Sequence, residues 1–152
     1  LSSLNEIDNV HSLRKYLKEN FIDFSGIKED KVVLPYHNLK YEDYSIWIGK
    51  NAKNNDILTQ KLAHKDDFWL HAKDVSGSHV VIKNKAGKTT PLYVIEKAAQ
   101  WAAFYSKRKT DSLCPVIYTP KKYVRKPKGF PAGAVVVDKE QVILVVPEKP
   151  PF

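Results

Sequence analysis

The 152-residue sequence contains no methionine and a single cysteine, so the paired thiols of disulfide frameworks and cysteine metal sites are missing. The lone thiol of Cys114 excludes an intrachain disulfide and fits a reducing, cytoplasmic setting. Because it begins the apolar run Cys114–Tyr118, which is typical of a core strand, we expect it to be buried and unreactive. The absence of methionine and the start at Leu1 predict a fragment whose natural N-terminus is missing.

Long apolar runs are absent as well. No segment approaches the roughly 18 to 20 apolar residues of a membrane span, and charges interrupt the first residues, where a secretory signal would be apolar. We therefore expect no membrane association and a cytoplasmic location. The loop Gly49–Asp56 lacks the Gly-Lys-Ser/Thr ending of a P-loop, so it predicts no nucleotide pocket.

The positive charge is concentrated in one part of the chain. The net charge is +8, and residues 105–130 contain eight Lys or Arg residues but only one Asp. A solvated basic loop is one interpretation. The other is a surface for a polyanion, either a nucleic acid or phospholipid headgroups. Tyr123 and Phe130 lie among these cations, where aromatic rings can stack on unpaired bases.

The segment Phe68–Ile82 predicts a β-hairpin around which the rest of the chain is organised. Apolar residues flank a polar corner on both sides, and Gly77 is the residue expected to supply a positive φ there. His71, Asp74 and His79 gather close to this corner. Such a concentration of hydrogen-bonding side chains between buried strands indicates a binding surface.

The remaining pattern predicts an α+β fold. We expect a single domain with a mostly antiparallel sheet of about five to seven strands, one long buried helix and one short helix. Short strands are predicted at 32–34, 44–48 and 114–118, and residues 134–137 and 142–146 predict a closing hairpin. The short helix would begin at Asn55 or Asp56, as the N-cap, and run to about Ala63.

Two longer helices are predicted. One begins with Thr90 as N-cap and Pro91 at the first helical position, runs to about Lys107 and is mostly apolar, so it should be the main core helix. The other covers residues 3–21, where Ser3–Glu6 fits a capping box. Residues 1–30 would be the end of an upstream helical or coiled-coil arm, and residues 31–152 the domain.

A metal-dependent hydrolase is an alternative interpretation of the hairpin. The imidazoles of His71 and His79 could converge on one ion with the Asp74 carboxylate. The sequence has no His-Glu-x-x-His motif and no second carboxylate cluster to complete such a site. The simpler alternative is that both histidines hydrogen-bond within the hairpin and hold its shape. We therefore expect no metal, no cofactor and no catalytic residue.

Four motifs in order resemble one known family. They are Ile46–Thr59, Asp67–Val81, Ser106–Lys109 and Tyr118–Gly129. Together they resemble the NFACT-R domain, the RNA-binding module at the C-terminal end of RqcH/NEMF-type ribosome quality control factors. Bacterial members often carry the label fibronectin-binding protein, which leaves an extracellular-matrix adhesin as a further alternative. The resemblance covers roughly residues 35–147.

The resemblance implies a binding module rather than an enzyme. Proteins of this family bind the large ribosomal subunit carrying a stalled peptidyl-tRNA and recruit tRNA, so that a C-terminal tail is added to the nascent chain. The implied partners are tRNA, ribosomal RNA of the large subunit and the complex of nascent chain and tRNA.

The hypothesis that follows is one RNA-binding face, formed by the loop 50–56, the hairpin 71–79 and the loop 121–128, with the end of the long helix beside them. The candidate residues are Lys50, Asn51, Asn54, Asn55, Asp56, His71, Lys73, Asp74, Gly77, Ser78, His79, Lys107, Arg108, Lys121, Lys122, Tyr123, Arg125, Lys126 and Lys128.

Overall fold

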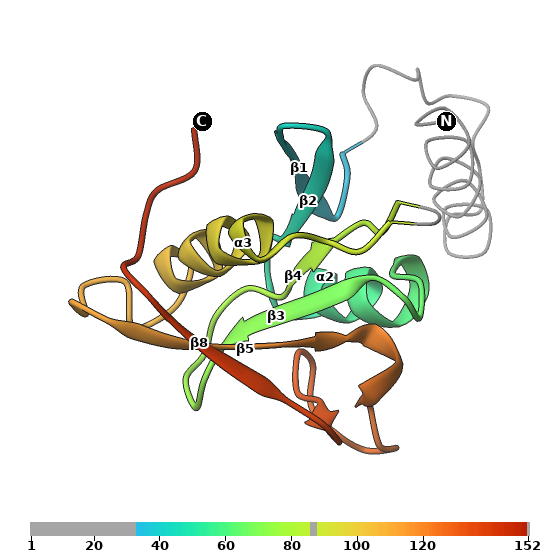
Figure 1. The fold of residues 1–152 in the computed structure, drawn as a ribbon. Helices are drawn as coiled ribbons and strands as arrows, with labels where there is room; N and C mark the ends of the chain where they lie inside the picture. The colour runs from blue at the N-terminus through green and yellow to red at the C-terminus, as the bar shows by residue number, and fades with distance from the viewer. Residues whose placement is uncertain (1–32, 86–87, 152) are drawn as a thin grey trace.

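The computed structural model describes residues 33–85 and 88–151, which form an α+β fold (Figure 1). The strands are β1 (Tyr36–Tyr41), β2 (Tyr44–Gly49), β3 (Phe68–Ala72), β4 (Val80–Ile82), β5 (Cys114–Pro120), β6 (Val124–Arg125), β7 (Val136–Val137) and β8 (Gln141–Val145). The helical elements are α2 (Ala52–Asp56), the π-helix η2 (Ile57–Leu62), α3 (Leu92–Phe104) and the 3-10 helix η3 (Lys121–Tyr123). The predicted fold class is confirmed for this part of the chain, and the predicted helix at 3–21 lies outside it.

Six strands form one sheet in the order β1-β2-β4-β3-β5-β8, and every neighbouring pair is antiparallel. The predicted hairpin is confirmed, because β3 and β4 pair with Phe68 opposite Ile82 and Leu70 opposite Val80. The two strands lie in the middle of the sheet. The loop 73–79 between them is therefore anchored to the centre of the sheet.

Both faces of the sheet are covered. Alternation along β2 sends Ile46 and Ile48 to the core under α3, while Trp47 enters a second core with Leu58 and Val124. Figure 1 shows α3 and α2 on different sides of the central strands. The second core places η2 and β6 against the sheet face opposite to α3. This packing brings residues 50–62 and 124–137 close to the hairpin.

The main core helix is confirmed, with different ends. Pro91 is the N-cap of α3, and the hydroxyl of Thr90 is buried without a partner among the described residues, so the prediction of a Thr90 cap is wrong. The helix ends at Phe104, not near Lys107, and beyond it the hydroxyl and the backbone N–H of Ser106 both donate to the carbonyl of Ala103. None of the helices in residues 33–85 and 88–151 is long and apolar enough to cross a membrane.

Two predicted strand features are wrong. Val33 and Leu34 lie outside any strand, and Val33 is 78% exposed, since the first strand begins at Tyr36. The closing hairpin does not form either. Instead, β8 pairs with β5 and extends the large sheet, while β7 pairs with β6. Each strand gains a partner that lets it bury apolar side chains, which a hairpin of the two strands alone would not provide.

Candidate nucleic-acid interface

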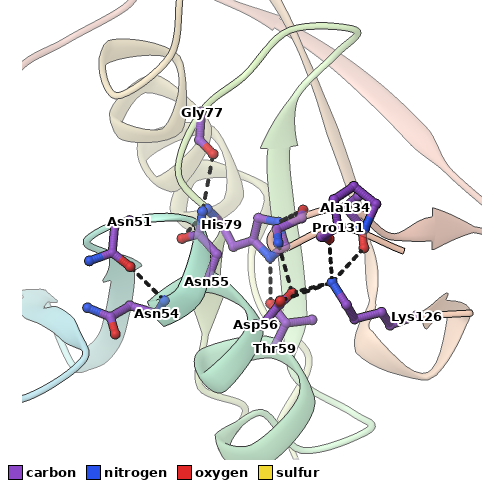
Figure 2. A network of polar contacts seen from close by, with 11 residues as sticks. Asn51, Asn54, Asn55, Asp56, Thr59, Gly77, His79, Lys126, Pro131 and Ala134 are labelled. Atoms are coloured by element: carbon purple, nitrogen blue, oxygen red, sulfur yellow. Dashed lines mark hydrogen bonds and ion pairs between the residues drawn. The ribbon is translucent and has the colours of Figure 1, made fainter. Parts of the chain in front are cut away.

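His79 is the residue at which the hairpin, η2 and the segment before β7 meet (Figure 2). It is 1% exposed, its Nε2 lies 2.9 Å from the carbonyl oxygen of Gly133, and its Nδ1 lies 2.7 Å from Thr59 Oγ1. A carbonyl oxygen can only accept, so Nε2 carries a proton, and in the neutral ring Nδ1 then accepts from the Thr59 hydroxyl. His79 therefore joins three separate parts of the chain.

The surroundings of His79 keep it neutral. Burial, and then the neighbouring His71, lower the pKa of His79 to about 3. Burial also lowers the pKa of His71, whose Nε2 lies 3.2 Å from the carbonyl oxygen of Gly77. The two rings lie edge to face, with centroids 5.4 Å apart. The hydrogen bond of His71 confirms the interpretation that it shapes the hairpin, whereas both ring partners of His79 lie outside the hairpin.

The low pKa of His79 predicts a loss of stability in mild acid. The unfolded chain binds a proton at its ordinary pKa of 6.5, and the folded chain does so only near a pKa of about 3. The contribution is therefore complete above about pH 6.5 and falls toward about pH 3, by up to roughly 1.4 kcal/mol per pH unit. Urea unfolding at about pH 7.5 and about pH 5 should differ by roughly 2 kcal/mol from His79 alone. An equal pH dependence in His79→Leu would contradict this assignment.

Asn55 joins α2 to the hairpin from a buried position. Its Oδ1 accepts from the backbone N–H of His79 at 3.1 Å, and its Nδ2 donates to the carbonyl of Gly77 at 3.4 Å. Gly49 makes this possible, because a Cβ there would lie 1.9 Å from Asn55 Oδ1. The prediction that Asn55 or Asp56 caps the helix is wrong. Asn51 is the N-cap, with its Oδ1 accepting from the backbone N–H of Asn54 at 2.8 Å.

Lys126 and Asp56 fasten the segment 126–134 to the end of α2 (Figure 2). The Lys126 ammonium lies 2.9 Å from both carboxylate oxygens of Asp56 and also donates to the carbonyls of Pro131 and Ala134. The backbone N–H of Gly133 donates to the same carboxylate at 3.1 Å. Lys126, which sequence analysis placed among the RNA-binding cations, therefore has a structural role inside the domain.

The loop of the hairpin is held against the end of α3. The backbone N–H groups of Ser78 and Lys107 donate to the carbonyls of Tyr105 and Ser76, each at 3.0 Å. Gly77 is required here by close approach, since a Cβ would lie 2.8 Å from Ser106 Cβ. The expected positive φ at Gly77 is wrong, because the residue with that conformation is Asp74, at φ 60°.

A cleft of about 890 Å³ lies between this loop, the start of α2 and residues 132–137. The candidate residues that line it are Asn51, Asn55, His71, Asp74, Gly77, Ser78, His79 and Lys107. Lys50 and Lys53 flank lining residues in the sequence, and both are exposed. Asn54 and Lys73 are partly buried and are sequence neighbours of the lining residues Asn55 and Asp74. The structure thus brings the loop 50–56, the hairpin and the end of α3 together around one opening.

The cations of the later basic segment are placed differently. The backbone N–H groups of Lys121 and Lys122 bond to the carbonyls of Asp67 and Lys65, at the start of β3. Lys128 is exposed after β6. These three cations do not line the cleft.

Three other candidates have partners within the domain. Arg125 Nε lies 3.0 and 3.1 Å from the two carboxylate oxygens of Asp138. Arg108 bonds to Asp111 and to the backbone carbonyl of Lys73. Lys122 and Lys139 lie over the ring of Tyr123, 5.3 and 5.1 Å from its centroid. Tyr123 is therefore flanked by cations rather than open on both faces.

The bonding of His79 argues against a metal-dependent hydrolase. Both of its ring nitrogens are engaged, by Thr59 and Gly133, so neither is free to bind an ion with His71 and Asp74. In the described part of the chain, no three His, Cys, Asp or Glu side chains are grouped so that they could hold a metal ion. The hydrogen bonds of His71 and His79 instead fix the conformation of the hairpin and of the segments packed against it.

Comparison with known proteins identifies the family. The model of the NFACT protein RNA-binding domain matches residues 33–139. The chain belongs to the NFACT RNA-binding domain family. This is a family of non-catalytic RNA-binding modules found in Rqc2/RqcH homologues, which are ribosome quality control factors.

Two named relatives of this NFACT domain are similar over most of the chain. The Rqc2 homolog RqcH of Bacillus subtilis is 40% identical over 118 residues, which are 74% of this chain and 20% of the relative. RqcH of Streptococcus suis is 38% identical over 153 residues, covering 96% of this chain and 26% of the relative. The chain thus spans about a quarter or less of these relatives.

A solved structure has the same fold as this NFACT domain. It is the C-terminal part of the fibronectin/fibrinogen-binding protein of Streptococcus suis. The TM-score is 0.69 at 32% sequence identity, and the match covers 93% of this chain and 57% of the other.

The two hydrogen-bond partners of the His79 ring in this NFACT domain were not predicted from the sequence. Thr59 lies within a short helix, where its spacing gives no sign of a buried hydrogen bond. Gly133 comes two residues after Pro131, a pattern that indicates a turn, and the structure has Gly133 at φ 82°. Its contact with a histidine 54 positions earlier was not, because local patterns carry no information on such distant pairs.

Proposed function

We propose that this NFACT domain binds tRNA or ribosomal RNA of the large subunit through the face that contains the cleft. The observation that carries the proposal is a set of three exposed lysines, Lys50, Lys53 and Lys107, at or beside the cleft. None of them pairs with a carboxylate of the described residues. Such cations are available to phosphates, unlike Lys126 or Arg125.

The interior of the cleft is suited to contacts other than phosphate. Its two histidines are neutral because burial lowers their pKa values. Ser76, Ser78 and Asn51 supply uncharged donors and acceptors along the walls. A positive rim beside a mostly uncharged lining, in which Asp74 is the one carboxylate among the described residues, fits a ligand that carries charge outside and hydrogen-bonding edges inside, as RNA does.

The proposed role of the parent protein follows from its relatives. We infer that it is a ribosome quality control factor that acts on large subunits carrying a stalled peptidyl-tRNA and supports C-terminal tailing of the nascent chain. The peptide-bond chemistry would be the ribosome's, and this domain would contribute binding. The naming of the relatives as Rqc2 homologues supports this inference.

Binding of the 152-residue chain to total tRNA across a salt series tests the proposal. Three phosphate contacts predict a slope of about −2 to −3 for the logarithm of the binding constant against that of the salt concentration. Excess polyglutamate, a polyanion without bases or sugars, should not displace the tRNA. Absence of binding at low salt, or binding that does not depend on salt, would contradict the proposal.

A second candidate function comes from the name of the solved neighbour, a fibronectin/fibrinogen-binding protein. Immobilised fibronectin offers a direct comparison with tRNA under the same buffer. If the chain bound fibronectin tightly and tRNA not at all, the adhesin interpretation would replace the RNA-binding one.

A further inference from the structure

The cleft is larger and chemically more varied than phosphate binding requires. Its volume of about 890 Å³ lies within the range of sites that enclose small organic molecules. Its lining comes from separate parts of the chain, of which the start of α2, the hairpin and residues 132–137 are held in place by the contacts of His79, Asn55 and Lys126. It is therefore a preformed space rather than a gap between independent loops.

The floor of the cleft is aromatic. Trp69 and His71 lie on the same face of β3 with nearly parallel rings, 6° between planes and 5.8 Å between centroids. His79 stands perpendicular to both. Trp69 and His79 are buried, whereas His71 is partly exposed, and Tyr105 lines the cleft as well. The partly exposed rings of His71, which Trp69 supports from below, and of Tyr105 are therefore the surfaces on which a planar heterocycle can stack.

Hydrogen-bonding groups along the lining indicate the chemistry of the ligand. The hydroxyls of Ser76 and Ser78 lie along the same lining. A ligand with carbonyl and ring-nitrogen acceptors would match these donors.

We propose that the cleft receives one unstacked nucleotide of the bound RNA. The base lies on the aromatic floor beside His71, with its edge toward the serine hydroxyls, and the adjoining phosphate lies at Lys107 on the rim. This inference rests on the proposed function and adds to it a preference for unpaired RNA, because a base inside a duplex cannot leave its stack without loss of pairing.

Filling the cleft tests the proposal. Ala132 and Ser76 are exposed residues of the cleft lining. In Ala132→Phe and Ser76→Phe the new ring would occupy the cleft from its open side, and neither substitution adds a polar group. Ala132→Ser, which adds little volume, is the matched control. The probes are a labelled single-stranded RNA of about 12 nucleotides without self-complementarity and the blunt duplex that it forms with its complement.

The unmodified chain should bind the single strand about 10-fold more tightly than the duplex, as expected for one stacked base. Both phenylalanine variants should lose this preference and keep the duplex affinity, while Ala132→Ser keeps the preference. Urea unfolding midpoints establish which variants are folded. One folded phenylalanine variant is enough to test the proposal. Equal binding of both RNA forms, or an unchanged preference in a folded phenylalanine variant, would overturn this proposal alone. No binding of any RNA would overturn the proposed function as well.

Discussion

Simultaneous replacement of Lys50, Lys53 and Lys107 by alanine is expected to weaken tRNA binding about 100-fold near 0.1 M salt. Each phosphate contact releases condensed counterions and contributes about 0.7 to 0.9 to the salt slope. Three lost contacts should therefore reduce the slope by about 2 to 3. All three side chains are exposed, so stability should remain almost unchanged.

The matched control for this triple variant is Lys121→Ala, Lys122→Ala and Lys128→Ala in one chain, which removes the same charge. These lysines do not line the cleft, so the control should bind tRNA more tightly than the first triple variant at every salt concentration. The reverse order would place the main phosphate contacts on the segment 121–128 instead. Equal losses would mean that net charge, rather than position, governs binding.

His79→Leu is expected to lower the free energy of unfolding by about 3–5 kcal/mol. Leucine fills much of the space of imidazole but leaves the Thr59 hydroxyl and the Gly133 carbonyl without their present partners. Each buried polar group left unpaired costs about 1–3 kcal/mol. The loss is large compared with the roughly 5–15 kcal/mol that holds a typical domain folded. Urea unfolding measures it.

Two variants show whether the hydrogen bonds cause this loss. His64→Leu replaces an exposed histidine and should change stability by less than about 0.5 kcal/mol. Adding Thr59→Val to His79→Leu removes the orphaned hydroxyl, so the double variant should be about 1–2 kcal/mol more stable than the sum of the single effects. Strict additivity would refute a bond between the two side chains.

The local parts of the fold could be predicted from the sequence because their signals are local. Alternation identified β2, apolar runs around a polar corner identified the hairpin of β3 and β4, and a broad apolar surface identified α3. The same local signals do not determine which strands pair with one another. Residues 134–137 and 142–146 look like a hairpin, yet β7 and β8 pair with strands elsewhere in the chain.

The candidate site was predicted by composition, which treats every cation and every amide as available. Lys126 pairs with Asp56, which lies 70 positions earlier, and the side-chain amide of Asn55 forms its hydrogen bonds within the protein. Lys50 and Lys107 remain available, but their neighbours in sequence give no sign of this difference. The packing of η2 and β6 against the sheet determines which side chains bond within the domain and which remain available to bind RNA.

Amide chemical-shift mapping of the chain during titration with tRNA tests the central claim most directly. The account predicts that the largest changes fall in residues 50–55, 73–79, 105–107 and 132–137, which surround the cleft. Changes confined to the exposed side of α3, to β8 or to residues 121–128 would contradict it.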